Sequence, residues 1–349
     1  MINYLHGSPD EFYNFVDRIS KEDKIGVMTH IDLDGVASAI FLEKILESKD
    51  LKINSLNFSG YGKGVLSRTF RRTIPNKLFI TDFQADEHPE EFSFLKKNCD
   101  VFLVDHHPLH EKFKDEPGII KTESADCSAY CLFELAKHYL DTKPLEWLVC
   151  SAMIFDYSFQ KEENFNLIKL IYPDAVKEKI FESEPGQIGR KISRALIYYD
   201  SNKKMVYNSI LKEDFKKLEK ADKIIGEEID LWVEKFKKEA EHFQEKDLYF
   251  YYGFPKYGIS NIVASILSSN YFNKSSIVFA SDYINRKNQI RISARNNSGK
   301  INIGEVLKKC TKGFYNATAG GHPKASGADF PKQYLSEFKT RLLSELPND

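Results

Sequence analysis

The chain has 349 residues, of which 42% are hydrophobic and 29% are charged, an ordinary composition for a soluble globular protein. This length is enough for two domains and a connector between them. The formal net charge is −1, which excludes a protein whose whole surface binds polyanions, so any affinity for nucleic acid must come from a local basic site.

The cysteines and the N-terminus indicate an intracellular protein. The five cysteines are scattered along the chain, and Cys127 and Cys131 lack a second pair at the spacing of a zinc site. We expect reduced cysteines that serve packing in a cytosolic protein. The N-terminus is polar, without a signal-peptide pattern, and no apolar run approaches the ~18 residues of a membrane helix. The expected location is the cytoplasm, with no membrane partner.

The first part of the chain alternates predicted helices and strands. The predicted helices cover residues 9–19, 36–46, 65–72 and 87–98, and the predicted strands cover 24–29, 51–58, 77–81 and 101–104. Ser8 and Pro9 favour a helix start, because serine caps the first turn and proline suits it. The alternation predicts a doubly wound parallel sheet, whose ligands bind beyond the carboxyl ends of the strands.

Helices dominate the middle of the chain, and the pattern changes again at Asp247. Predicted helices cover residues 126–140 and 143–155, and a charged helical stretch covers 161–242. Beyond it, predicted strands cover 248–252, 276–280 and 289–294, and predicted helices cover 259–268, 303–309 and 331–346. We expect an α/β protein with three parts: a domain with a doubly wound parallel sheet (1–185), a helical connector (186–245) and a smaller C-terminal α/β domain (246–349).

Metal-competent side chains follow the predicted strands and end one predicted helix. They are His30, Asp32, Asp34, Asp82, Asp105, His106, His107 and Asp156. In a doubly wound sheet these points converge on one crevice, and the carboxylates gathered there would repel one another. A pair of divalent cations removes that conflict. Mixed Asp and His ligands suit Mn²⁺ best, with Mg²⁺, Co²⁺ or Zn²⁺ as alternatives.

Each of these residues taken singly has a simpler interpretation. A lone Asp after a strand is usually a helix cap or a turn residue, and a lone His is usually a surface or core residue. Asp86 competes with Asp82, but it lies four residues beyond the strand and is expected to start a helix. Gly35 is expected to relax the turn after Asp34. The coincidence of several sites at matching positions favours two metal ions, a recurrent arrangement for hydrolysing phosphate esters.

These residues resemble the motifs of the DHH phosphoesterase superfamily. The first motif resembles His30-x-Asp32-x-Asp34-Gly35, the second Asp82, the third Asp105-His106-His107 and the fourth Asp156. The fourth departs from the more usual Asp-Thr pairing, because Tyr157 follows Asp156. Further along, Gly320-Gly321-His322-Pro323-x-Ala325-x-Gly327 resembles the Gly-Gly-His motif of the associated C-terminal domain.

The resemblance implies a role for each of these residues. One ion would be held by His30, Asp32 and Asp82, and the other by Asp34, Asp82, His106 and Asp156, with Asp82 bridging them. Asp105 would orient the pair or touch a metal, and His107 would face the scissile phosphate. These two are the predicted catalytic residues.

The second domain carries the predicted substrate contacts. Gly320 and Gly321 allow backbone N–H groups to approach an anion, and His322 and Lys324 can add hydrogen bonds or charge. Arg291 and Arg295 share one strand face, and arginine suits phosphate contacts and base stacking. The resemblance favours Arg295, through Ser293-x-Arg295. The glycine pair as a tight turn only, and Arg291 as a solvated strand residue, remain alternatives.

The resemblance to RecJ-like exonucleases and nanoRNases implies the activity. We expect a metal-dependent exonuclease that hydrolyses single-stranded or short RNA or DNA to mononucleotides with a two-metal-activated hydroxide. One alternative is a phosphodiesterase or phosphatase of a cyclic dinucleotide or small nucleotide. Another, from a different class, is a non-catalytic DHH module in a replication or repair assembly. A homodimer and a replication or repair protein are the other partners considered.

Overall fold

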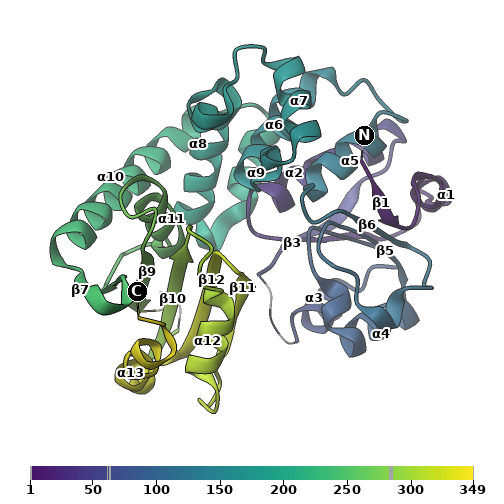
Figure 1. Cartoon of the computed structure of the whole chain (residues 1–349). Coiled ribbons are helices and arrows are strands. Elements are labelled where there is room, and N and C mark those ends of the chain that lie inside the picture. The colour runs from purple at the N-terminus through teal and green to yellow at the C-terminus, as the bar shows by residue number, and fades with distance from the viewer. Residues whose placement is uncertain (1, 61, 63, 283–285, 349) are drawn as a thin grey trace. The chain divides into compact units, whose positions relative to one another are not determined.

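The computed structural model describes residues 2–60, 62, 64–282 and 286–348. The chain divides into two compact units, Met1–Asp222 and Lys223–Asp349, and each unit contains one six-stranded sheet with helices on its faces (Figure 1). The predicted α/β class, with a parallel N-terminal sheet, a helical region and a smaller C-terminal domain, is confirmed.

The sheet of the first unit is parallel except at one edge. Its strands are β1 (Tyr4–His6), β2 (Ile25–Thr29), β3 (Ile53–Phe58), β4 (Lys77–Thr81), β5 (Asp100–Asp105) and β6 (Ile119–Thr122). They lie in the order β1-β6-β5-β4-β2-β3, and only β1 runs antiparallel, against β6. Because β4 lies between β2 and β5, the carboxyl ends of these three strands are neighbours, although they are far apart in the sequence.

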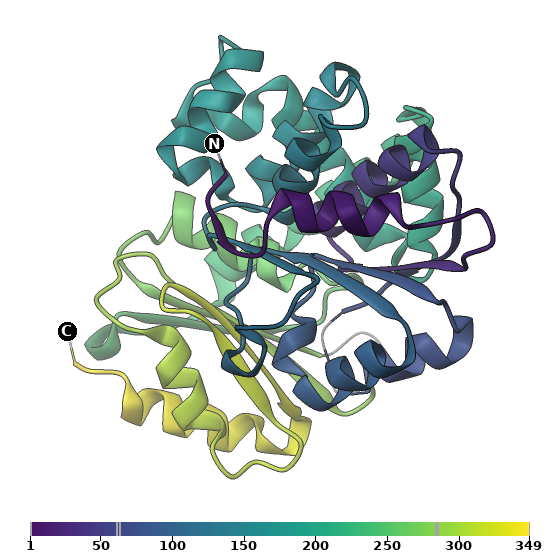
Figure 2. The same ribbon diagram turned by 90° about the vertical axis from the view of Figure 1, so that its right-hand side faces the viewer.

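Helices cover both faces of this sheet because its strands alternate apolar side chains between the faces. Val27, Phe79 and Phe102 face α1 (Pro9–Asp17), α2 (Leu33–Ser48) and α5 (Ser128–Ala136). The next residue of each strand, Met28, Ile80 and Leu103, faces α3 (Val65–Thr73) and α4 (Pro89–Asn98). Figure 2 shows α1 in purple on one side of the strands and the blue helices on the other.

Four further helices extend the first unit: α6 (Glu146–Phe155), α7 (Glu162–Ile171), α8 (Glu184–Tyr198) and α9 (Lys203–Leu211). α6 packs against α2, α5 and α8. Ile192 of α8 and Val206 of α9 join the core of this unit. The predicted connector at 186–245 is therefore divided, since the boundary between the units lies at 222/223, within α10 (Lys216–Glu239). The domain limits at 185/186 and 245/246 stay a prediction.

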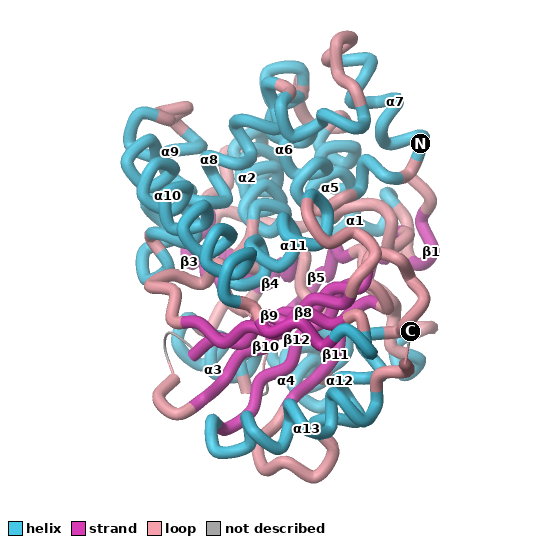
Figure 3. The backbone as a smooth tube through the Cα atoms, turned by 60° about the vertical axis from the view of Figure 1, so that its left-hand side comes forward, coloured by secondary structure: helices cyan, strands magenta, loops and turns pink. Residues whose placement is uncertain are grey.

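The sheet of the second unit is mostly antiparallel. Its strands are β7 (Glu241–Phe243), β8 (Leu248–Gly253), β9 (Ser276–Asp282), β10 (Gln289–Asn296), β11 (Thr318–His322) and β12 (Ala325–Pro331), in the order β11-β12-β10-β9-β8-β7. In Figure 3, α12 (Ile303–Thr311) and α13 (Leu335–Glu345) cover one face and α11 (Ser260–Asn270) lies on the other. Phe330 of β12 and Phe338 of α13 pack together in the core of this unit.

The sequence pattern did not predict several of the strands. β1 and β7 have three residues each, too few to show a period, and β6 is a four-residue run with a lysine inside it. β11 was not predicted because it contains the two glycines of the Gly-Gly-His segment, and glycine is uncommon in strands. It forms a hairpin with β12. No helix in the described part of the chain combines the length and the apolar composition that crossing a bilayer requires.

Candidate metal centre

The ends of β2 and β4 place His30 and Asp82 at the edge of the sheet. Asp82 follows β4 directly, and its backbone N–H donates to the carbonyl of Val104 at 3.0 Å. Its φ of 50° lies in the left-handed region, which is uncommon for a residue other than glycine. Such conformations gather at functional sites, where the surrounding structure holds them in place. The backbone of Asp82 is therefore held between the ends of β4 and β5.

Asp32 and Asp34 lie where α2 begins. Asp32 caps the helix, accepting from the N–H of Gly35 at 3.1 Å, and its Oδ2 lies 2.8 Å from Nδ1 of His30. A side chain at Gly35 would place its Cβ 2.5 Å from the carbonyl oxygen of His30. The expectation that Gly35 relaxes the turn is wrong, because its φ is not positive and the residue lies in the first helical turn. Glycine is required there by close packing on His30.

Asp34 is buried and is held by backbone amides from a distant helix. The N–H groups of Ser128 and Ala129, in the first turn of α5, donate to its two oxygens at 2.9 and 2.7 Å. Free N–H groups at a helix N-terminus favour a carboxylate. Burial nevertheless raises the pKa of Asp34 above its usual value, although His106 acts in the opposite direction.

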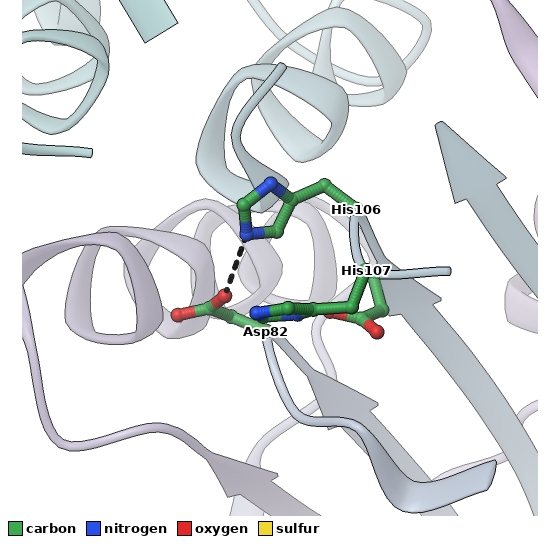
Figure 4. A group of neighbouring side chains, drawn as sticks. Asp82, His106 and His107 are labelled. Carbon is green, nitrogen blue, oxygen red and sulfur yellow. Dashed lines mark hydrogen bonds and ion pairs between the residues drawn. The ribbon is translucent and has the colours of Figure 1, made fainter. Parts of the chain in front are cut away.

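The structure brings all eight predicted residues of the first unit into three adjoining groups. The first group is His30, Asp32 and Asp82; the second is Asp34, His106 and Asp156; the third is Asp82, Asp105, His106 and His107. Within each group the candidate ligand atoms lie within 4.8 Å of one another. Figure 4 shows the rings of His106 and His107 extending from the end of β5 toward Asp82. Asp82 and His106 each belong to two groups.

The distances around His106 leave its nitrogens without hydrogen bonds. Nε2 lies 3.6 Å from Oδ1 of Asp82, and Nδ1 lies 3.7 Å from Oδ2 of Asp156, both beyond hydrogen-bond range. Nδ1 of His106 and Oδ2 of Asp82 are buried without a hydrogen-bond partner in the described part of the chain. Buried polar atoms rarely remain unpaired, because the lost hydration is costly. These orphaned atoms fit the role of metal ligands.

The electrostatics of the clustered carboxylates also fit a metal centre. Desolvation raises the pKa of Asp82 and of Asp156 well above the usual value, and the nearby carboxylate of Asp34 raises both further. Divalent cations would stabilise the ionised forms and remove this repulsion. Since the donors are Asp and His only, the chemistry suits Mn²⁺, Mg²⁺, Co²⁺ or Zn²⁺. The residues present therefore fit a metal centre.

Asp105 and His107 form a separate pair. Nδ1 of His107 lies 2.8 Å from Oδ1 of Asp105, and the other oxygen of Asp105 accepts from Nζ of Lys121 at 2.7 Å. Burial alone would raise the pKa of Asp105, but Lys121 and His107 hold it well below its usual value. Lys121 was missed in the sequence. The available signal was a lysine inside the short apolar run that forms β6.

Asp86, the rejected competitor of Asp82, is the second partner of Lys121. It lies in the short 3₁₀ turn Ala85–Glu87 and is fully buried, with Oδ1 2.8 Å from Nζ of Lys121. It belongs to none of the three metal-competent groups in the described residues. A residue taken as a helix start is therefore one carboxylate of a buried ion-pair network.

Three of the substrate-contact candidates, Arg295, His322 and Lys324, lie at one end of the second sheet. Arg295 on β10 pairs in register with Ala325, which pairs with His322 across the β11–β12 hairpin. Its side chain is 8% exposed and donates to Oγ of Ser265, to the carbonyl of Ala294 and to the side chain of Asn261. His322 and Lys324 are exposed at the hairpin.

The other candidates of the second unit occupy the same sheet. Arg291 is exposed and forms an ion pair with Asp329, with Nε 3.1 Å from Oδ1. Gly321 has φ of 131°, and a Cβ there would lie 2.7 Å from the carbonyl oxygen of Ala325. A Cβ at Gly320 would meet open space. Glycine at 321 is thus required by the backbone of the hairpin, whereas position 320 leaves room for a ligand.

Two family models match the chain. The N-terminal domain of the DHH family matches residues 24–153, and the DHHA1 domain matches residues 249–347. The chain belongs to the DHH phosphoesterase superfamily. Its C-terminal part is a DHHA1 domain, and the described metal-competent groups belong to the DHH part and to Asp156, three residues beyond the matched range.

Solved structures share the fold of this DHH protein at low sequence identity. A crystal structure of exonuclease RecJ bound to manganese has a TM-score of 0.74 and 15% identity, covering 97% of this chain and 94% of that one. RecJ from Thermus thermophilus in complex with Mn²⁺ has a TM-score of 0.71 and 14% identity, covering 97% and 55%. CDC45 from Entamoeba histolytica has a TM-score of 0.63 and 12% identity, covering 97% and 98%. No match emerges among curated protein sequences.

The crowding of carboxylates leads to a prediction about stability. We expect Asp82→Asn to raise the thermal midpoint of the metal-free protein by about 2 °C or more, because it removes one buried charge from the group. Asparagine also tolerates the left-handed backbone at this position. The same variant should lose most of the stabilisation that excess Mn²⁺ confers on the wild type. Thermal melts with EDTA and with Mn²⁺ measure both effects.

Asp126→Asn is the matched control. Asp126 is equally buried, but its carboxylate lies 3.0 Å from Nζ of Lys161 and 2.9 Å from Nδ2 of Asn164. Removal of that charge should lower the midpoint, since Lys161 loses a buried partner. An Asp82→Asn protein that melts below the wild type and still gains stability from Mn²⁺ would contradict the assignment of Asp82.

Proposed function

We propose that this chain is a divalent-metal-dependent phosphodiesterase that acts as an exonuclease on single-stranded or short RNA or DNA and releases mononucleotides. The observation that carries the proposal is the convergence of three Asp and His groups that share Asp82 and His106. Membership of the DHH superfamily supports phosphoester hydrolysis in general. Structures of RecJ share this fold, namely exonuclease RecJ bound to manganese and RecJ from Thermus thermophilus in complex with Mn²⁺ or Mg²⁺, and they support the choice of reaction and ion.

The proposed roles follow the three groups. His30, Asp32 and Asp82 would hold one ion, and Asp34, Asp82, His106 and Asp156 would hold the other. When bound, two divalent cations supply a hydroxide near neutral pH and neutralise charge on the phosphoryl oxygens. Every position of the set carries a side chain that can ligate a metal, which favours an enzyme over a non-catalytic DHH module.

His107 and Asp105 would act on the substrate phosphate. Asp105 accepts the Nδ1–H of His107, and we assign the other ring nitrogen, Nε2, to the substrate phosphate. A carboxylate that accepts from imidazole also stabilises the protonated ring. We assign His107 the hydrogen bond to the scissile phosphate, and Asp105 the orientation of the imidazole.

The second unit would hold the nucleotide end of the substrate. The exposed His322 and Lys324 offer a hydrogen bond and a charge to phosphate, and Gly320 leaves the backbone open to it. Arg291 and Arg295 add guanidinium groups on β10. Few basic groups are involved, and the net charge of −1 provides no general attraction to a polyanion, which favours short substrates over long strands.

A gel of end-labelled oligonucleotides tests the proposal. RNA and DNA strands from dinucleotides upward, labelled at either end and incubated with Mn²⁺, should give mononucleotides from one end, and the label that leaves first gives the polarity. Equal cutting of a closed circular strand would rule out an exonuclease. Hydrolysis of only a cyclic dinucleotide or a nucleotide phosphate would support the small-substrate alternative. No turnover of any phosphoester with any divalent ion would support the binding module.

The shared ligands should be essential for hydrolysis. We expect His106→Ala and Asp82→Ala each to lower kcat/KM for bis-p-nitrophenyl phosphate with Mn²⁺ by at least about 100-fold, since loss of a ligand costs no less than loss of a group that orients one. Circular dichroism checks the fold. His242→Ala is the control, because His242 is exposed and stacks on Tyr249, and it should keep wild-type activity. Activity of His106→Ala within about tenfold of wild type would contradict the two-metal assignment.

The kinetics of an Arg295 variant can test substrate binding separately from the chemical step. Arg295→Ala should raise KM for a short oligonucleotide by about tenfold, the value of one charge-assisted hydrogen bond, and should leave KM for the aryl phosphodiester nearly unchanged. Steady-state kinetics on the two substrates with one enzyme preparation measure the difference. Equal effects on both substrates would show that the DHHA1 domain is not a substrate clamp.

A further inference from the structure

Lys121 is a buried cation that the proposed chemistry does not use. It lies on β6 in register with Asp105 of β5, and it is 1% exposed. Its ammonium group has three donors, and the structure gives it three acceptors: Oδ2 of Asp105 at 2.7 Å, Oδ1 of Asp86 at 2.8 Å and the carbonyl of Pro108 at 3.5 Å. The ammonium group is thus fixed in place by acceptors from two backbone segments, one at Asp86 and the other at residues 105–108.

These bonds determine the orientation of Asp105. Its Oδ2 faces Lys121 and its Oδ1 faces Nδ1 of His107, so both oxygens are engaged on opposite sides. An ionised carboxylate only accepts, and therefore the proton in this bond belongs to Nδ1 of His107. Rotation of the carboxylate would break one bond or the other. Lys121 consequently acts on the imidazole of His107 through Asp105.

Asp86 completes the charge balance. It is fully buried, and besides Lys121 it accepts from the backbone N–H of His110 at 2.8 Å, which ties down the segment after His107. Two carboxylates and one ammonium leave one negative charge in the network. Without Asp86, Lys121 would cancel the charge of Asp105, and without Lys121 two buried carboxylates would repel each other. Together the pair leaves Asp105 with a charge to offer His107.

We infer that Lys121 and Asp86 are positioning residues: they hold Asp105 so that it fixes the imidazole of His107 in its Nδ1–H form. The catalytic part of this inference rests on the proposed function, whereas the geometric part concerns only His107. A merely structural ion pair is the competing explanation. Buried ion pairs often add little to the free energy of unfolding. Orientation of Asp105 therefore explains the ion pairs of Lys121 better than stabilisation of the fold does.

Kinetics of three charge variants test the catalytic part. Lys121→Met should lower kcat for bis-p-nitrophenyl phosphate with Mn²⁺ about 10–100-fold, with KM and the half-saturating Mn²⁺ concentration within about twofold of wild type. The double variant Lys121→Met/Asp86→Asn again has one negative charge beside His107, and it should recover most of kcat. Asp86→Asn alone keeps the volume and the acceptor for His110, and it should also lower kcat.

The matched control is Lys203→Met. Lys203 on α9 is also a buried cation, paired with Asp200 and the carbonyl of Leu196, but it contacts no residue of the site through those bonds. The kcat of the Lys203→Met enzyme should equal that of the wild type. A Lys121→Met enzyme with kcat within twofold of wild type, or a double variant no faster than the single one, would overturn the inference. Should Lys121→Met fail to fold, Asp86→Asn and the double variant decide the question through the same comparison.

An activity-independent readout separates this inference from the proposed function. In the ¹⁵N-histidine-labelled full chain with Mg²⁺, the ring nitrogens of His107, identified by their loss in His107→Gln, should report a hydrogen-bonded Nδ1–H. That signature should disappear in Lys121→Met and return in the double variant. If it does so while the wild type hydrolyses no phosphoester, the proposed function fails and the positioning role stands. An unchanged His107 signature in Lys121→Met would refute the positioning role whatever the activity.

Discussion

The repulsion among carboxylates at the carboxyl edge of the first sheet is the constraint on which the candidate site depends. Asp34, Asp82 and Asp156 approach one another through the shared His106, and desolvation together with repulsion from neighbouring carboxylates raises the pKa of each. The carboxylates at the margins have partners within the protein, His30 beside Asp32 and Lys121 beside Asp105. Among the described residues, no protein partner fully neutralises the negative charge of the central carboxylates. A divalent cation bound there would neutralise the remaining charge.

Strand order creates this crowding. β4 lies between β2 and β5, so Asp82 stands between the residues that follow its two neighbours. α2 and α5 then begin at the same edge, and the N-terminus of α5 donates two amides to Asp34 across 94 and 95 residues of sequence. Asp82, a candidate ligand, and Tyr157, which follows the candidate ligand Asp156, both have positive φ. The surrounding structure therefore holds the backbone at the site in conformations that are unfavourable on their own.

The DHHA1 domain distributes its candidate groups differently. His322 and Lys324 project from an exposed hairpin, whereas the guanidinium of Arg295 already binds the side chains of Ser265 and Asn261 on α11. His322 and Lys324 can meet a ligand directly, whereas Arg295 also ties β10 to α11. Under the proposed function, recognition and chemistry would depend on separate sheets, each with its own core, so that changes in one set of contacts need not disturb the other.

The sequence by itself determined the α/β class and the eight ligand and catalytic candidates, because each follows a buried apolar run whose period is local. Short strands such as β6 carry too few residues to show a period. Only the tertiary structure decided the partners of these candidates: Lys121 meets Asp86 across 35 residues and Asp105 across 16. It also decided that Arg295 is buried and that Gly35 serves close packing. Such contacts arise from strand order and helix placement, long-range properties that no local pattern encodes.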